Sequence, residues 1–291
     1  MLRRSRFVSR RRFLKTTVQV AAVAGAPQVV PGRALGFGGV APSERITLAG
    51  LGIGGRGAGD LRCFMSNPEV QVVAICDVRK ARREAIKQMA DKHHGNSDCA
   101  MYRDMHEMLA RPDIDVILTA TGDRWHALAS ILACKAGKDV YSEKPCSTTI
   151  AQSQALADTF RHYGRVYQAG TQRRSIGNFL FAARLVAEGK LGKLHTVHAN
   201  TLNPATSHQW LPEEPLPPKD ECDWDLWLGP CPWRPYNSRY VRGGWRGFFD
   251  FHGGGILEWG SHTVDLCQWA AQKDHTTPVE YTPDQQGVVC T

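Results

Sequence analysis

One glycine-rich segment limits the folds open to this chain more than any other feature. An apolar run over residues 46–49 passes directly into glycines at positions 50, 52 and 55, and a second apolar run, Val70–Cys76, ends at Asp77. Glycines in this order after a strand permit a tight turn, close approach of the backbone to a pyrophosphate, and close packing of helix on strand. Asp77 follows Gly55 by 22 positions, where a ligand of a ribose 2′-hydroxyl is expected. The spacing therefore predicts a dinucleotide-binding unit rather than a simple connecting turn.

The first 34 residues carry the pattern of an export signal. The segment Ser9–Lys15 reads S-R-R-R-F-L-K, and a weakly apolar stretch with small residues follows it. This resembles a twin-arginine signal. A membrane anchor is disfavoured because the stretch is shorter than the ~20 residues that span a bilayer, and Pro27 and Pro31 interrupt it. A disordered basic tail is the remaining alternative. We therefore expect a signal segment over 1–34, a periplasmic or otherwise exported protein, and no stable membrane span in its mature form.

The same segment accounts for the net charge of the chain. It contains eight of the 36 Lys and Arg residues and no acidic residue, which leaves 28 basic and 28 acidic residues in the remainder. A basic segment that serves as an export address does not form a binding face. Nucleic acid is therefore excluded as a predicted partner.

The cysteines give no sign of a metal site or a disulfide framework. There are nine of them, an odd number, and none forms a C-x-x-C pair. The histidines also lack the spacing of metal ligands, so no metal is predicted. Cys222 and Cys231 flank a tryptophan-rich loop, and their pairing after export is left open.

Short apolar runs alternate with longer mixed segments between residues 45 and 168. This rhythm is typical of a doubly wound parallel sheet. The predicted strands are Ile46–Leu51, Val70–Cys76, Val116–Ala120, Asp139–Ser142 and Arg165–Gln168, and two predicted helices are Lys80–His93 and Ala127–Ala136, the latter ending at Gly137.

Beyond Gly170 the composition changes. Seven of the eight tryptophans follow position 200, and prolines cluster between Pro212 and Pro235. A loop of this length and aromatic content is a candidate lid or binding wall. The strand-like run Gln286–Cys290 has no following partner, so we expect the second domain to be incomplete here.

Several motifs together resemble one enzyme family. Glu143-Lys144-Pro145 is similar to the E-K-P motif of the glucose-fructose oxidoreductase/inositol dehydrogenase (Gfo/Idh/MocA) family. Supporting segments occur in the family's order over about residues 45–275. They are Thr121–His126 (T-G-D-R-W-H), Gly170–Ser175 (G-T-Q-R-R-S), Asp223–Pro230 (D-W-D-L-W-L-G-P), Gly253–Gly255 and Gly260–Asp265 (G-S-H-T-V-D).

The resemblance implies an α/β fold in two domains. A Rossmann domain over 45–168 would precede an α/β domain over 169–291 that is built on a large open, mainly antiparallel sheet. The active site would lie in the crevice between them, and open α/β sheets do bind ligands at the carboxyl ends of their strands. A homo-oligomer is also expected.

The same resemblance implies three catalytic residues. Lys144 would hold the substrate hydroxyl, where a cation favours a developing alkoxide. His262 would take the hydroxyl proton, because an imidazole pKa lies near working pH. Four residues before this histidine the family usually has Asp, and this chain has Glu258. The carboxylate could still orient and charge His262, but its extra methylene shifts the oxygens by roughly an ångström.

The remaining site residues are expected to bind cofactor or substrate. Cofactor contacts are predicted for Gly50, Gly52, Ile53, Gly55, Arg56, Asp77, Thr121, Trp125, His126 and Glu143, and substrate contacts for Gln172, Arg173 and Asp265. NAD is the first choice because the Asp77 carboxylate would repel a 2′-phosphate. Arg56 and Arg79 keep NADP open as the alternative.

The sequence thus predicts an exported NAD-dependent oxidoreductase that acts on a secondary alcohol of a sugar or cyclitol. The main alternative is NAD-dependent glycoside hydrolysis, in which transient oxidation of the sugar labilises its glycosidic bond. Exported relatives with that activity lack the E-K-P lysine, which disfavours this reading. An inactive nucleotide- or sugar-binding relative is the third hypothesis, motivated by Glu258 and by the expected incompleteness of the second domain.

Overall fold

The computed structural model describes residues 39–201 and 209–280. The predicted export signal and the run 286–290 lie outside these residues. The chain divides into two compact units, Met1–Arg45 and Ile46–Thr291. The described part of the first unit contains one short 3-10 helix, η2 (Pro42–Glu44).

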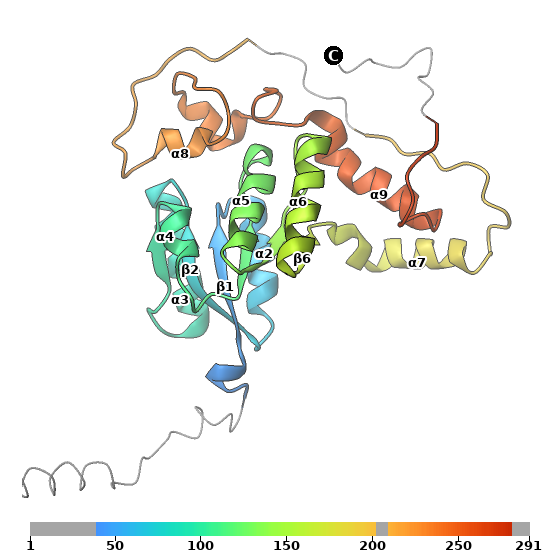
Figure 1. The fold of residues 1–291 in the computed structure, drawn as a ribbon, viewed down its shortest axis with the longest axis horizontal. Coiled ribbons are helices and arrows are strands. Elements are labelled where there is room, and N and C mark those ends of the chain that lie inside the picture. The colour runs from blue at the N-terminus through green and yellow to red at the C-terminus, as the bar shows by residue number, and fades with distance from the viewer. Residues whose placement is uncertain (1–38, 202–208, 281–291) are drawn as a thin grey trace, which may run out of the picture. The chain divides into compact units, whose positions relative to one another are not determined.

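Six parallel strands form the sheet of the second unit (Figure 1). They are β1 (Ile46–Leu51), β2 (Val70–Cys76), β3 (Ala100–Tyr102), β4 (Val116–Thr119), β5 (Asp139–Ser142) and β6 (Tyr167–Ala169). Their order is β3-β2-β1-β4-β5-β6, and every neighbouring pair is parallel. This is the order of a dinucleotide-binding Rossmann sheet, with its switch point between β1 and β4. The predicted doubly wound fold is confirmed.

Helices cover both faces of this sheet. They are α2 (Gly55–Met65), α3 (Lys80–His94), α4 (Met105–Leu109), α5 (Asp123–Lys135) and α6 (Ile150–Tyr163). Two clusters of buried apolar side chains, one on each face, form the core. In α5, predicted over 127–136, the helix begins four residues earlier and stops before Gly137, whose φ of 79° favours glycine.

The described residues after β6 form helices and loops. These helices are η3 (Gln172–Ser175), α7 (Gly177–Ala187), α8 (Trp224–Leu228), η4 (Tyr240–Gly244), η5 (Ile256–Gly260) and α9 (Ser261–Ala270). Between 170 and 280, the described part has one isolated bridge, from Arg79 to Cys222, and no extended strand. The mainly antiparallel sheet expected for this domain is therefore not represented in these residues. Helices α7 and α9 pack side by side, and neither contains a buried residue (Figure 1).

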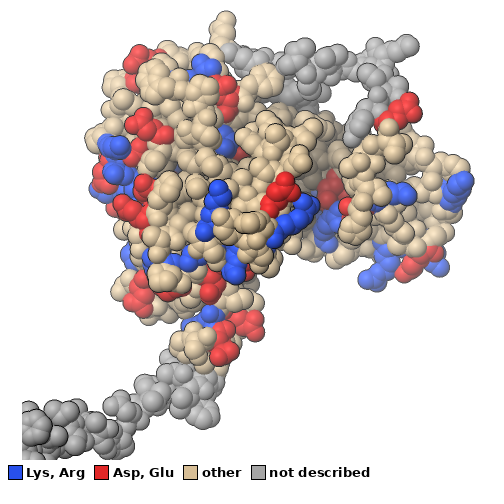
Figure 2. Space-filling model, viewed as in Figure 1, with Lys and Arg blue, Asp and Glu red and all other residues tan. Residues whose placement is uncertain are grey.

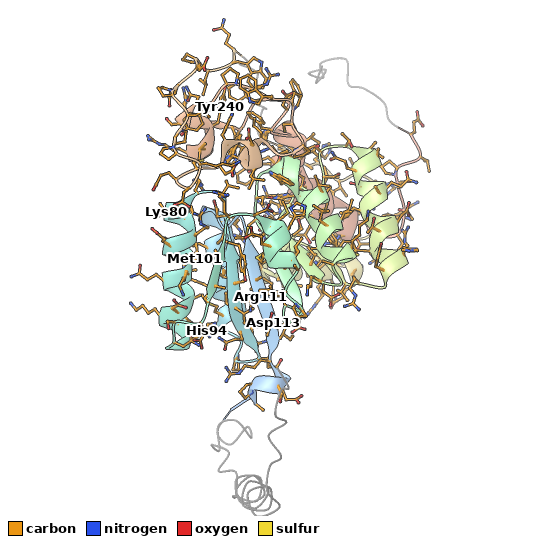
Figure 3. All side chains as sticks on the ribbon, turned by 60° about the vertical axis from the view of Figure 1, so that its left-hand side comes forward. Lys80, His94, Met101, Arg111, Asp113 and Tyr240 are labelled. Atoms are coloured by element: carbon orange, nitrogen blue, oxygen red, sulfur yellow. The ribbon has the colours of Figure 1, made fainter. Side chains whose placement is uncertain are left out.

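The tryptophan-rich segment forms its own apolar cluster beyond the carboxyl end of the sheet. Its buried members are Trp224, Trp227, Leu228, Tyr240, Phe248 and Phe251. Tyr240 lies beyond one end of the strands, whereas Arg111 and Asp113 lie near the other (Figure 3).

A contact with α5 holds the tryptophan-rich segment against the Rossmann domain, where Trp227 lines the crevice described below. The buried Arg124 guanidinium lies 3.7 Å from the ring centroid of Trp227 and donates to the Trp227 carbonyl oxygen at 2.6 and 3.0 Å. Cys222 and Cys231 are both free thiols, and Cys231 donates to the Asp250 carbonyl oxygen. The two cysteines therefore do not pair.

The surface of the folded part is mixed in charge. Lys and Arg alternate with Asp and Glu over the face in view (Figure 2), as the balanced composition beyond residue 34 requires. Within the described ranges, no helix combines the length and apolarity needed to cross a bilayer.

Candidate active site

A crevice of about 700 Å³ lies at the carboxyl ends of β1, β2 and β4. Residues of both halves of the chain line it. Thirteen of the sixteen predicted site residues belong to this lining, and Gly50, Ile53 and Asp265 do not. The thirteen are Gly52, Gly55, Arg56, Asp77, Thr121, Trp125, His126, Glu143, Lys144, Gln172, Arg173, Glu258 and His262.

The glycine loop packs so closely against Thr121, just after β4, that Gly52 has no space for a side chain. Gly52 has a φ of 64°, and a Cβ there would lie 3.0 Å from the Thr121 Cα. Gly55 begins α2 and has open space around it, whereas a Cβ at Gly57 would meet the Ala120 Cβ at 2.5 Å. The close helix–strand packing expected of the third glycine is therefore a property of Gly57. The Ile53 side chain is fully buried in the core, so that only its backbone could contact a cofactor.

Asp77 lies just beyond the carboxyl end of β2, where the Rossmann fold binds the adenosine ribose. Its side chain is buried, and Oδ1 accepts a hydrogen bond from the Arg79 backbone N–H at 2.9 Å. Burial raises the pKa of this carboxyl above its usual range. Arg79 also donates through its guanidinium to the Val241 carbonyl oxygen at 3.0 Å. That bond ties the loop after β2 to the second half of the chain.

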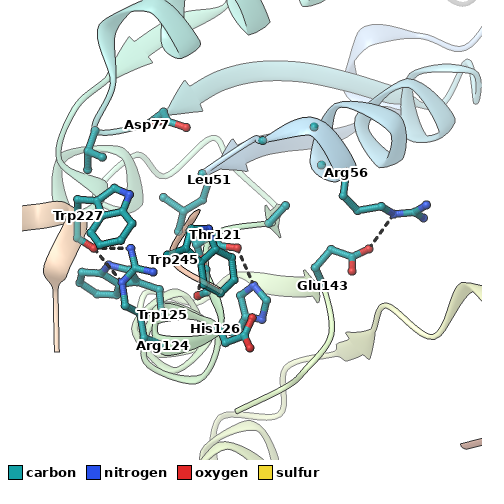
Figure 4. A pocket seen from close by; sticks show the side chains of 18 of the residues that line it. Leu51, Arg56, Asp77, Thr121, Arg124, Trp125, His126, Glu143, Trp227 and Trp245 are labelled. Atoms are coloured by element: carbon teal, nitrogen blue, oxygen red, sulfur yellow. Dashed lines mark hydrogen bonds and ion pairs between the residues drawn. The ribbon is translucent and has the colours of Figure 1, made fainter. Parts of the chain in front are cut away.

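Glu143 of the E-K-P motif connects the glycine loop to the substrate side. Its Oε1 accepts from Arg56 Nε at 3.2 Å (Figure 4). Oε1 also accepts from the Gln172 side-chain amide, and Oε2 accepts from the Lys144 backbone N–H. Arg56 is also paired with Asp60 at 2.5 Å. Burial and the nearby Asp60 raise the pKa of Glu143 to about 7. The Arg56 charge, which the sequence left open to a 2′-phosphate, is thus matched by two carboxyl groups.

The first turn of α5 holds two of the predicted cofactor residues, Trp125 and His126, and a third, Thr121, lies just before the helix. His126 is buried, with Nδ1 2.7 Å from the Pro145 carbonyl oxygen and Nε2 3.2 Å from that of Thr121 (Figure 4). Burial lowers its pKa. Trp125 donates through Nε1 to the Leu226 carbonyl oxygen at 3.1 Å. These side chains brace the crevice by joining its segments to one another.

Lys144 and Glu258 meet at the end of the crevice that is predicted to bind the substrate, called the substrate end below. Lys144 Nζ donates to the Glu258 carbonyl oxygen at 2.8 Å and to Oε1 of the same residue at 3.2 Å. The other oxygen, Oε2, lies 3.1 Å from His252 Nε2 and 3.4 Å from Arg246 Nε. The hydrogen bond from His252 and the adjacent cations lower the pKa of Glu258 to about 2. The sequence analysis did not single out His252 or Arg246 as partners of Glu258, although they lie only six and 12 positions from it.

Asp123, His252 and Glu258 also form a group of potential metal ligands, with ligand atoms all within 4.8 Å of one another. The imidazole argues against that use. His252 Nδ1 accepts from the backbone N–H groups of Gly247 and Gly254 at 3.2 and 3.3 Å, so Nε2 carries the ring proton. A metal-bound histidine has the reverse arrangement, with its other nitrogen donating. His252 is therefore a hydrogen-bond donor to Glu258.

His262 differs from its expected setting in two respects. Glu258 is bonded to Lys144 and His252 rather than to His262, and the His262 Nδ1 is buried with no hydrogen-bond partner among the described residues. Its pKa is lowered to about 4, first by burial and then by the cations Lys144, Arg173 and Arg56. The expectation of a pKa near working pH is therefore corrected: this imidazole is neutral at neutral pH.

Of the three predicted substrate residues, two line the crevice and one does not. Gln172 and Arg173 line the crevice. Asp265 instead accepts two hydrogen bonds from Arg174, each at 2.8 Å, and Arg174 also pairs with Asp274. Asp265 is thus part of an ion-pair cluster that joins η3 to α9.

Known proteins share this architecture. Residues 45–171 match the model of the oxidoreductase family's NAD-binding Rossmann fold, and residues 183–288 match that of its C-terminal alpha/beta domain. The chain is 25% identical over 243 residues to the inositol 2-dehydrogenase of Salmonella typhimurium, covering 83% of this chain and 59% of that protein. It is 32% identical over 177 residues to a glycosyl hydrolase family 109 protein of Saccharopolyspora erythraea, covering 54% and 37%.

A solved structure agrees in fold. The structure of GenD2 from gentamicin A biosynthesis, in complex with NAD, superposes with a TM-score of 0.57 at 20% identity, covering 79% of this chain and 54% of that one. The chain spans about 59% of the length of the inositol dehydrogenases that it matches. Because the two domain models cover most of the sequence in the family's order, the chain belongs to the Gfo/Idh/MocA oxidoreductase family and carries its NAD-binding domain.

Proposed function

We propose that this protein is an NAD-dependent oxidoreductase acting on a secondary alcohol of a sugar or cyclitol. The position of Lys144 carries the proposal. Its ammonium group has three N–H donors, and Glu258 accepts two of them. The third is left for a hydroxyl oxygen in the crevice that Lys144 lines.

NAD bound along the glycine loop, with its adenosine ribose at Asp77, would supply the hydride acceptor. Lys144 would bind the substrate hydroxyl and stabilise the negative charge that its oxygen gains as the C–H bond breaks. Glu258, held from the other side by His252, would fix the direction of the remaining N–H. His262, which lines the crevice, would accept the hydroxyl proton, since a neutral imidazole carries one unprotonated ring nitrogen.

A second candidate is glycoside hydrolysis that uses NAD without net redox change. The 32% identity to a glycosyl hydrolase family 109 protein favours it. Lys144 of the E-K-P motif, at the position described above, favours net oxidation over hydrolysis.

The test is cofactor reduction by sugars and cyclitols on purified protein, followed by NADH absorbance, with release of p-nitrophenol from aryl glycosides in parallel. We expect NADH formation that Lys144→Ala abolishes. Aryl glycoside hydrolysis without net NADH would favour the second candidate. Neither reaction, in a protein that still binds NAD, would indicate an inactive relative.

We also propose export by the twin-arginine route and assembly into a homo-oligomer. The S-R-R-R-F-L-K segment supports the first, and the resemblance to the family supports the second. Because that route carries folded proteins, NAD could be loaded before export and retained as a bound group. Cell fractionation of the variant with Arg10 and Arg11 replaced by Lys should find it inside the cell. Sedimentation of the purified protein measures its assembly.

A further inference from the structure

One guanidinium that lines the crevice, that of Arg173, has no counter-ion among residues 39–201 and 209–280. Arg173 lines the crevice together with Lys144, Glu258 and His262. In the part of the chain that the structure describes, no carboxylate pairs with it, whereas the adjacent Arg174 is paired with two aspartates. The nearby carboxylates are already engaged. Glu258 is shared by Lys144 and Arg246, and the buried Asp123 accepts from the Gly253 backbone.

Aromatic rings hold this guanidinium without neutralising it. Arg173 Cζ lies 5.4 Å from the ring centroid of Phe179 and 5.7 Å from that of Trp259. Contact with ring faces restricts an arginine side chain while its in-plane N–H donors remain available. The restricted fork is suited to a planar or tetrahedral anion, which guanidinium binds through two parallel hydrogen bonds.

We infer that the substrate carries an anionic group, a carboxylate or a phosphate, which pairs with Arg173 while the reacting hydroxyl binds Lys144. This inference rests on the proposed function and narrows its substrate class from sugars and cyclitols in general to those that carry a carboxylate or a phosphate. Arg173 would then be a specificity-determining residue.

The surroundings of His262 agree with this assignment. The unpaired Arg173 charge is one of the causes that lower the pKa of this imidazole. A substrate anion would neutralise that charge, and the pKa of His262 would rise towards the range in which a base transfers protons in both directions. A neutral substrate would leave the charge in place.

The test is calorimetric binding to the full-length protein saturated with NAD, using sugars that differ only in the anionic group. Suitable sets are glucose, glucuronate and glucose 6-phosphate, and galactose, galacturonate and galactose 6-phosphate. We expect at least one anionic member to bind about 10–100-fold more tightly than its neutral counterpart, the range for a hydrogen bond to a charged group. Within each set, whether the uronate or the 6-phosphate binds more tightly shows which anionic group the site prefers.

Three variants complete the experiment. Arg173→Gln should remove the preference, Arg173→Lys should retain part of it, and Arg161→Gln, which removes a charge from the exposed face of α6, should leave it intact. Thermal melting checks that each variant is folded. Equal affinity within both sets, the absence of binding by every anionic sugar, or an unchanged preference in Arg173→Gln would overturn the inference. NADH formation from a neutral sugar alone would overturn it while the proposed function stands. Tight anion binding through Arg173 without hydride transfer would overturn the proposed function while the anion site stands.

Discussion

The two ends of the crevice differ in how their polar groups are satisfied. At the nucleotide end, Arg56 is matched by Asp60 and Glu143, and Asp77 is held by Arg79. At the substrate end, the guanidinium of Arg173 and the Nδ1 of His262 lack partners among the described residues. The side chains of the first end are therefore largely satisfied within the protein. The second end presents an unpaired guanidinium, which we propose pairs with the substrate.

Replacing Gly52 should break the nucleotide end completely. Gly52→Val places a β-branched residue at a φ of 64° and drives its Cβ against Thr121, and such backbone strain alone costs of order 1–3 kcal/mol. We expect no measurable NAD binding by calorimetry. Gly59→Ala is the matched control, because Gly59 lies in α2 outside the crevice lining and its Cβ meets open space, and it should bind NAD within a few-fold of the parent. Equal loss in both variants would contradict the assignment of Gly52 as the point of close approach.

Removing His262 should damage the substrate end and spare the other. His262→Ala is expected to lower kcat by about 10²–10⁴-fold, the range for loss of a general base, with NAD affinity unchanged. Because the active imidazole is neutral and its pKa is about 4, kcat/KM of the parent should fall as the pH drops through about 4. In Arg173→Gln the loss of a cation favours the protonated ring, so the pH–rate profile should shift upward in pH. A profile that does not move would show that Arg173 does not act on His262.

The parts of the fold and of the site that the sequence predicted are those that depend on local patterns. Strand β1, the glycine turn and Asp77 follow from local patterns, since apolar runs and steric requirements act over a few residues. Strands of three residues are at the limit of what a sequence pattern shows, since β6 was predicted and β3, of the same length, was missed. The contact between Glu258 and Lys144 was beyond sequence analysis, because the two residues are 114 positions apart and only the tertiary fold joins them. His252 lies six positions before Glu258, but no sequence pattern marked it as a partner.

Glu258 should also contribute to stability in a pH-dependent way. Its pKa falls from an ordinary 4.5 to about 2 in the folded protein, so the ionised carboxylate stabilises the fold fully above about 4.5 and progressively less as the pH falls towards 2. Glu258→Gln should therefore be less stable at pH 7 by on the order of 2–3 kcal/mol. Urea unfolding at several pH values measures the gap between parent and variant. A gap that stays constant from neutral to strongly acidic pH would argue against an ionised Glu258 as its source.

The smallest expected effect concerns His252. His252→Phe removes the donor to Glu258 Oε2 and should lower kcat about 10-fold, the low end for a hydrogen bond to a charged group. His252→Gln keeps an N–H donor in a similar position and should recover most of the rate, with NAD affinity unchanged in both variants. Chelators should not affect the parent. Loss of activity on chelation, restored by a divalent ion, would instead identify Asp123, His252 and Glu258 as a metal site.

The contact between Arg124 and Trp227 bears on the cooperativity of folding. The Arg124 guanidinium is buried, and desolvation lowers its pKa to about 10. Most of its hydrogen bonding comes from a carbonyl oxygen more than 100 positions away in the sequence. If the tryptophan-rich segment detached alone, the Arg124 guanidinium would lose both the Trp227 ring that covers it and the Trp227 carbonyl oxygen that accepts its hydrogen bonds. The folded unit that begins at Ile46 should consequently unfold in a single transition. A fragment ending at β6 should be less stable than the nucleotide-binding half is in the intact protein.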